Sequence, residues 1–179
     1  MARYSRIVKK KKQVSSIPFL PEIVQTFVAR RVIDAAGLAL VLGGFALMAA
    51  LASYSSADPS WNTATGSSAH IHNWMGLPGA WIADVLVQTL GLGGGAFGLV
   101  AALWGTKILA RQDLSPLPLR FAALIATALF ISMSVAMIPA GTWLVNPWLG
   151  GSGGTLMLNG IAGVIQPFTG TASHIIIAL

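Results

Sequence analysis

Cysteine is absent from this sequence of 179 residues, and charged residues are scarce. The chain therefore offers no disulfide framework, thiolate metal site or cysteine nucleophile. Charged residues make up 9% of the sequence, against about 25% in average soluble domains. Hydrophobic residues make up 55%, and the mean hydropathy is +0.73. A soluble fold needs a polar shell that this composition does not supply. This excludes an ordinary cytosolic enzyme, a disordered regulator and a free nucleic-acid-binding domain, and indicates a membrane protein.

Long apolar runs predict an all-α fold, a polytopic transmembrane helical bundle, because a spanning helix needs about 20 mostly apolar residues. About four spans are expected, at residues 32–54, 80–110, 121–140 and, apparently cut before its end, 155–179. The second run is longer than a bilayer is thick and contains glycines at positions 91 and 93–95. It predicts a shallow helix at 78–90, followed by a kink and a spanning part. Pro167 and Gly170 are expected to break the fourth run.

The cations form two clusters that predict the orientation of the chain. Eight of the eleven lie before residue 32, and the others are Lys107, Arg111 and Arg120. By the positive-inside rule, the N-terminus and the loop at 107–120 are cytoplasmic, whereas residues 55–79 and the loop near Asn146 are outside. Five of the six tryptophans fall on the outer side and resemble an interfacial aromatic belt. Cleavage at the A-x-A site of residues 50–52 is an alternative. The basic and apolar stretches before it are longer than in typical signal peptides, which favours an uncleaved anchor.

Residues 1–31 predict a cytoplasmic basic tail and an interfacial amphipathic helix. Four consecutive lysines at 9–12 are most simply a topology determinant. Contact with anionic lipid headgroups is a second interpretation. DNA contact is a third, although no structured reader accompanies the lysines. Pro21 can start a helix with one apolar face, formed by Ile23, Val24, Phe27 and Val28.

No motif for catalysis stands out. Residues 93–98 match G-x-G-x-x-G, but they lie inside an apolar run rather than at a strand–helix turn, so we reject a nucleotide site. The sequence contains no G-x-x-x-x-G-K-[ST] phosphate loop, so we expect no enzyme activity from these residues. His70 and His72 with Asp58 are too few to predict a metal site. The pairs Gly91/Gly95 and Gly94/Gly98 fit either close helix packing or a simple kink.

Intramembrane charges suggest a transport role by default. Asp34, Asp84 and Lys107, however, all fall near expected interfaces, where they can reach water. The first and third runs have almost no polar residues at their centres. A small transporter or pore is therefore a weaker hypothesis than an anchor.

The outer loop and the residues after it carry the most specific motifs of the sequence. Residues 48–61 read MAALASYSSADPSW, His72-Asn73 follows, and residues 76–84 read GLPGAWIAD. These elements resemble the N-terminal membrane domain of FtsK/SpoIIIE-type DNA translocases. The resemblance runs from about residue 29 onward and is strongest over residues 48–91.

The resemblance implies a four-span inner-membrane anchor at the division septum, with other division proteins as partners. In that family the anchor precedes a linker, a hexameric ATPase motor that uses ATP and Mg, and a DNA-orienting domain. These residues contain none of those parts, so they are expected to bind no cofactor and to reach DNA only through the motor. A free-standing accessory protein of the inner membrane is the main alternative, and a homo-oligomer is possible in either case.

Seven residues are candidates for packing or partner contact. They are Asp58, Pro59, Trp61, Gly79, Trp81, Asp84 and Gly91. Pro59 can end the extension of the first span, Asp58 can accept N–H groups of the turn, and Trp61 can anchor the turn at the interface. We expect Gly79 to permit close packing and Asp84 to cap or pair within the outer loop.

Overall fold

The computed structural model describes residues 21–60, 70–141, 144 and 147–169. Within these residues the fold is all-α, as expected, and the only β pairing is an isolated bridge between Pro139 and Trp148. In the part of the chain that the structure describes, three helical stretches are long and apolar enough to cross a membrane: Glu22–Ala52, Gly76–Leu109 and Leu117–Ser134.

Helix α1 (Glu22–Ala52) is one continuous helix of 31 residues. At about 1.5 Å per residue it is about 46 Å long, which exceeds the hydrocarbon thickness of about 30 Å. The sequence suggested an interfacial helix followed by a separate span from residue 32, but the structure has no break there. The reason is local, because no proline follows Pro21 before Ser53 ends the helix.

The expected kink in the second apolar run is present. Helix α2 (Gly76–Leu90) passes through a 3-10 turn, η1 (Gly91–Gly94), into α3 (Gly95–Leu109). Gly91 has a φ of +55°, a left-handed conformation that favours glycine. The elbow is fixed by two hydrogen bonds: the Ser132 hydroxyl donates to the Leu90 carbonyl at 2.7 Å, and the Leu92 N–H donates to the Leu149 carbonyl at 3.0 Å.

Helices α4 (Leu117–Ser134) and α5 (Gly151–Thr169) complete the described fold. Helix α4 begins after Pro116 and ends earlier than the span expected at 121–140. Helix α5 begins within the expected loop and continues through Pro167, so the expectation that this proline breaks the segment is wrong. A helix within a membrane protein tolerates proline where neighbouring groups satisfy the freed carbonyl. Residues 170–179, the end of the expected fourth span, lie outside the described residues.

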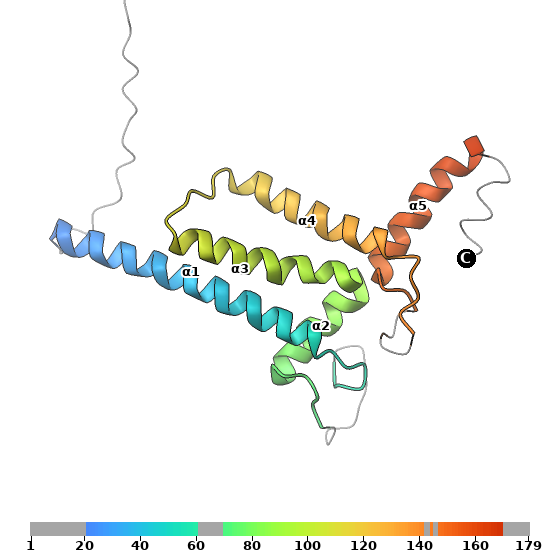
Figure 1. The fold of residues 1–179 in the computed structure, drawn as a ribbon, viewed down its shortest axis with the longest axis horizontal. Coiled ribbons are helices and arrows are strands. Elements are labelled where there is room, and N and C mark those ends of the chain that lie inside the picture. Colours follow the sequence, from blue (N-terminus) through green and yellow to red (C-terminus); the bar gives the residue numbers. More distant parts are fainter. Residues whose placement is uncertain (1–20, 61–69, 142–143, 145–146, 170–179) are drawn as a thin grey trace, which may run out of the picture.

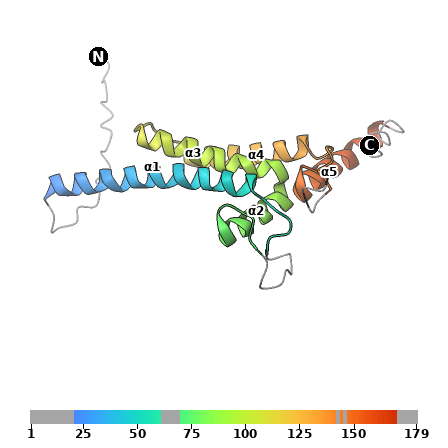
Figure 2. The ribbon, with the colours of Figure 1, turned by 60° about the horizontal axis from the view of Figure 1, so that its bottom comes forward.

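Helices α1, α3 and α4 lie side by side in one layer, with α3 in the middle (Figure 1). Turning the molecule shows α2 projecting from this layer at one end (Figure 2). Helix α5 extends from the same end as the α4 C-terminus (Figure 1).

Glycines on both partners make the contact between α1 and α3. A Cβ at Gly44 would lie 2.6 Å from the Gly98 carbonyl oxygen, and one at Gly105 would lie 2.6 Å from the Gly37 carbonyl oxygen. Each helix thus contributes two glycines seven residues apart to the seam. Of the pairs Gly91/Gly95 and Gly94/Gly98, only Gly98 lies in this seam, because a Cβ at Gly94 would meet Leu86 and the space beside Gly95 is open. Small residues at such a seam let two backbones approach closely.

The two ends of the layer differ in charge. The start of α1 and the α3–α4 connection lie at one end, where an Arg111 guanidinium nitrogen is 3.4 Å from the Asp34 carboxylate. Nearby, Trp104 packs edge-on against Phe121 with ring centroids 4.9 Å apart. The described parts of 53–75 and 135–150 lie at the opposite end (Figure 1). No Lys or Arg occurs in the sequence between residues 32 and 106 or after residue 120.

Candidate functional site

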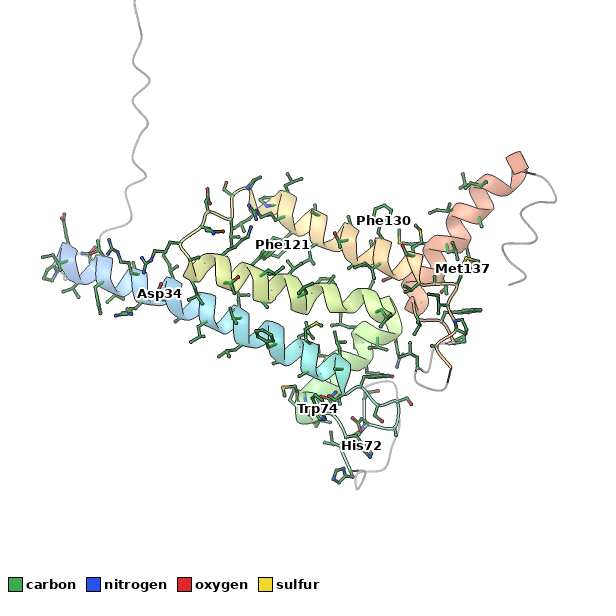
Figure 3. The ribbon with its side chains drawn as sticks, in the orientation of Figure 1. Asp34, His72, Trp74, Phe121, Phe130 and Met137 are labelled. Atoms are coloured by element: carbon green, nitrogen blue, oxygen red, sulfur yellow. The ribbon has the colours of Figure 1, made fainter. Side chains whose placement is uncertain are left out.

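Buried polar side chains gather at the end of the bundle that carries no cations. Among the described residues, the buried polar or charged side chains are Asp58, Asn73, Asp84 and Ser132. His72 and Trp74 mark this end, and Asp34 marks the opposite one (Figure 3). A buried carboxylate without partners costs several kcal/mol, so the partners of Asp58 and Asp84 decide what this region does.

Asp58 binds a segment that lies 14 and 15 residues further along the chain. Its Oδ1 accepts the His72 backbone N–H at 2.8 Å and lies 3.0 Å from the His72 ring Nδ1. Its Oδ2 accepts the Asn73 backbone N–H at 2.9 Å. With a side chain only 3% exposed, Asp58 has exchanged its water for these donors.

Asn73 carries the connection onward to α1. Its side-chain amide donates to the Ala50 carbonyl at 2.8 Å, near the end of α1. Its Oδ1 accepts the Met75 N–H at 3.0 Å, just before α2 begins. Beside it, the Ser53 hydroxyl accepts the Trp74 N–H at 3.0 Å. We call Asp58, His72, Asn73 and the Ala50 carbonyl the carboxylate clamp, because together they tie the start of α2 to the end of α1.

Asp84 anchors a second group of hydrogen bonds next to the clamp. Its Oδ1 accepts the Tyr54 hydroxyl at 3.0 Å and the Gln88 side-chain amide at 2.7 Å. Burial, and then the hydrogen bond to the Asp84 carboxylate, raise the pKa of the Tyr54 hydroxyl above its ordinary value. Tyr54 also belongs to a buried apolar cluster with Ala83 and Val87, so it joins the ends of α1 and α2 by packing as well as by hydrogen bonding.

Two candidate glycines stand at close contacts. A Cβ at Gly79 would overlap Met75 and lie 2.5 Å from the Asn73 Oδ1, so any side chain there would displace the clamp. A Cβ at Gly91 would overlap the Leu149 carbonyl. Gly79 therefore positions α2 against the clamp, and Gly91 lets the elbow approach the chain entering α5.

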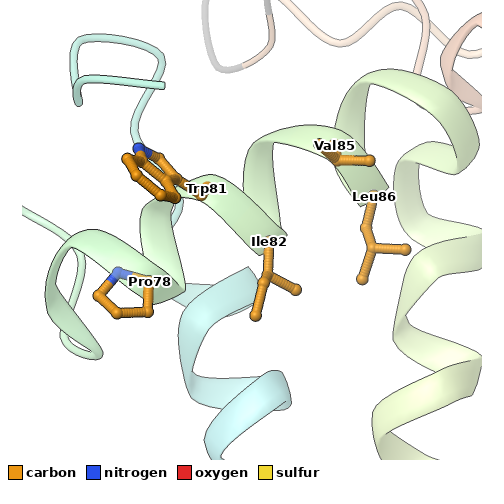
Figure 4. Close-up of a pocket in the computed structure, with 5 residues that line it drawn as sticks. All are labelled: Pro78, Trp81, Ile82, Val85 and Leu86. Carbon is orange, nitrogen blue, oxygen red and sulfur yellow. The ribbon is translucent and has the colours of Figure 1, made fainter. Parts of the chain in front are cut away.

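Of the two candidate tryptophans, only Trp81 lies in the described part of the chain. Trp81 is 38% exposed and borders an open apolar groove on α2 with Pro78, Ile82, Val85 and Leu86 (Figure 4). Trp74 was not among the candidates, yet it is 72% exposed on backbone that Ser53 fixes. Pro59 is half-buried after Asp58, and Trp61 lies outside the described residues.

The structure changes the interpretation of several sequence patterns. Asp58 was expected to accept N–H groups of its own turn, but its donors come from His72 and Asn73. His72 is accordingly a partner of Asp58, and the described residues contain no group of three His, Cys, Asp or Glu that could hold a metal ion. Tyr54, His72 and Asn73 were missed as site residues, although all three stand in the quoted motifs.

This arrangement orders the loop between α1 and α2. Asp58 uses both carboxylate oxygens, and Asp84 uses its Oδ1, to accept from donors within the chain. Combined with three helical stretches able to cross a bilayer, the geometry defines a multi-pass helical membrane protein whose polar groups hold its own elements together.

Comparison with known proteins identifies the family. Residues 29–179 match the 4TM region of DNA translocase FtsK/SpoIIIE, and the chain belongs to this family. Proteins named DNA translocase FtsK from Azospirillum brasilense, Agrobacterium fabrum and Caulobacter vibrioides are 34%, 32% and 32% identical over 88%, 86% and 73% of this chain. The chain spans only 26%, 17% and 16% of their lengths. No solved structure matches. The family resemblance drawn from the outer-loop motifs is confirmed.

Proposed function

We propose that this chain anchors a DNA translocase in the bacterial inner membrane at the division septum. The observation that carries the proposal is the family match over residues 29–179, which coincides with the three helical stretches able to cross a membrane. The relatives are named as translocases over lengths several times that of this chain. DNA movement, with its need for ATP and Mg, is therefore assigned to parts outside these residues.

The N-terminus is cytoplasmic in this proposal. The clustering of cations at the α1 start and the α3–α4 connection supports this orientation, because cytoplasmic loops carry the excess of Lys and Arg. The carboxylate clamp and Trp74 then face the periplasm. Because the chain contains no cysteine, single cysteines report the orientation directly. In spheroplasts a membrane-impermeant maleimide is expected to label Ser56→Cys and to spare Gln112→Cys, and the reverse pattern contradicts the orientation.

Contact with other division proteins is the second part of the proposal. The clamp holds the backbone of Trp74 and the first turn of α2 in place, so the periplasmic end presents an ordered surface. A binding partner then meets a surface that has already lost its conformational entropy.

The test is the position of a fluorescent fusion of residues 1–179 in dividing cells. An anchor of a septal translocase concentrates at midcell, and uniform membrane fluorescence contradicts the septal role. A fusion carrying Asp113→Asn is a control for substitution in general and should also concentrate at midcell, because it alters an exposed carboxylate at the end of the bundle away from the clamp. Solute flux through reconstituted protein that Asp84→Asn abolishes would instead identify a transporter.

A further inference from the structure

Five exposed or half-exposed cations come together at one end of the layer from four separate parts of the chain. They are Arg30 and Arg31 on α1, Lys107 in the last turn of α3, Arg111 in the α3–α4 connection and Arg120 in the first turn of α4. We call these five residues the cationic collar. The Asp34–Arg111 contact fixes the α3–α4 connection against α1, so the collar is a feature of the fold as well as of the sequence.

Three members of the collar, Arg30, Arg31 and Arg111, lie at the depth of lipid headgroups. The last 20 residues of α1, 33–52, are about 30 Å long at 1.5 Å per residue, which equals the thickness of the hydrocarbon core. Arg30 and Arg31 therefore stand within one helical turn of the hydrocarbon boundary. Arg111 reaches the same level because it contacts Asp34.

Acidic residues neutralise only part of this charge. The Asp34 carboxylate pairs with the Arg111 guanidinium, and Asp113 accepts the Ser115 N–H at 2.8 Å within its own loop. Glu22 stands eight residues before Arg30, about 12 Å further along α1. The guanidinium of Arg31 lies 5.1 Å from the Phe27 ring centroid, a contact that leaves its charge uncompensated.

Apolar side chains beside the cations distinguish a lipid from a nucleic acid. Phe27, Val32 and Ile33 are 57%, 62% and 54% exposed on the same stretch of α1. A phospholipid satisfies both features, because its phosphate meets the cations while its glycerol and acyl chains cover the apolar side chains. Duplex DNA meets only the cations, since it presents a charged backbone without an apolar counterpart.

We propose that the cationic collar binds the phosphate headgroups of anionic phospholipids, with Arg30 and Arg31 contributing most and Arg111 least. This inference rests on the proposed membrane anchoring and adds a lipid preference to it. Each unneutralised cation near the surface contributes about fivefold to the affinity for anionic lipid. Arg111 contributes less because Asp34 already pairs with it.

The experiment uses the full 179-residue chain in detergent and counts bound lipids by native mass spectrometry. Dioleoylphosphatidylglycerol and dioleoylphosphatidylcholine, which share acyl chains and differ in headgroup charge, are titrated separately. We expect tighter binding of phosphatidylglycerol. The Arg30→Gln/Arg31→Gln variant is expected to lose about 30-fold of this affinity.

Two further variants separate charge from folding. Arg30→Lys/Arg31→Lys keeps the charge and is expected to stay within a few-fold of the unaltered chain. The double variant Asp34→Asn/Arg111→Gln removes the ion pair without changing the net charge and is expected to change the affinity less than twofold, whereas Arg30→Gln is expected to lose about fivefold. Circular dichroism of each variant verifies that the helical content is retained.

Three results would overturn the proposal. Equal affinity for the two lipids removes the headgroup preference. Equal losses for Arg30→Gln and for Asp34→Asn/Arg111→Gln remove the distinction between free and paired cations. A 30-base-pair DNA duplex that displaces phosphatidylglycerol makes the collar a nucleic-acid surface. None of these outcomes affects the midcell position of the fusion, so the anchor and the lipid preference fail independently.

Discussion

Asp58→Asn tests whether the carboxylate clamp holds α2 against α1. The replacement keeps the shape of the side chain but removes the charge and turns one acceptor into a donor. Asp58 accepts two backbone N–H groups and lies within bonding distance of the His72 ring nitrogen. Hydrogen bonds to charged groups contribute about 1.5–3 kcal/mol each, and an asparagine oxygen retains about one of them. Counting only the backbone N–H that is no longer accepted, we therefore expect a local loss of about 1.5–3 kcal/mol.

Amide hydrogen exchange measures this loss at the residues concerned. In the unaltered chain the N–H groups of His72 and Asn73 exchange only when the clamp opens. A loss of about 1.5–3 kcal/mol accelerates their exchange roughly 10- to 150-fold. Asp113→Asn is the matched control, since Asp113 also accepts one backbone N–H, from Ser115, but is exposed at the other end. Exchange at His72 and Asn73 that stays within threefold in Asp58→Asn would refute the clamp.

Two further predictions concern the helix seam and the buried tyrosine. Gly44→Ala places a methyl group 2.6 Å from the Gly98 oxygen and should destabilise the chain by about 1–3 kcal/mol. The control Gly43→Ala enters open space and should stabilise the chain by up to about 1 kcal/mol. Equal unfolding midpoints of the two variants in detergent would contradict the seam. Because the pKa of Tyr54 is raised in the folded state, the folded chain keeps a proton that the unfolded chain loses, so stability is full below about pH 10 and declines above it. Absorbance titration of a Tyr4→Phe variant, in which Tyr54 is the sole tyrosine, should show no phenolate near pH 10 until the protein unfolds, and ordinary titration in the folded state would contradict the Asp84 contact.

Features governed by neighbouring residues were predictable from the sequence. Runs of apolar residues predicted the spanning helices, since helix formation and burial in lipid depend on composition over about 20 positions. The glycines at 91 and 93–95 predicted the elbow, because the left-handed φ at Gly91 is a local requirement that glycine meets. The ends of the elements were less predictable. Helix α1 absorbs the expected interfacial helix, since no residue between Pro21 and Ser53 interrupts its hydrogen bonding.

Contacts between distant residues could not be obtained from spacing. The partners of Asp58 lie across a loop, so nothing in the order of the residues joins them. His72 and Asn73 belong to the elements that carry the family resemblance, but the resemblance gives them no role. The α1–α3 seam shows the same limit, because a glycine pair within one helix does not reveal which other helix it faces. The usable signal was a seven-residue spacing shared by two helices, Gly37/Gly44 and Gly98/Gly105.

The distribution of buried polar groups favours an anchor over a pore. A transporter needs polar groups near the bilayer midplane, commonly where helices are interrupted. Among the described residues the buried polar side chains lie in the clamp, beside it or at the Gly91 elbow, and each has hydrogen-bond partners within the chain. Between that region and the cationic collar, α1 and α3 meet through glycines packed backbone against backbone. That seam offers an ion no replacement for its hydration shell, whereas close packing gives an anchor the stiffness to hold the carboxylate clamp and the collar at fixed positions at opposite ends of the bundle.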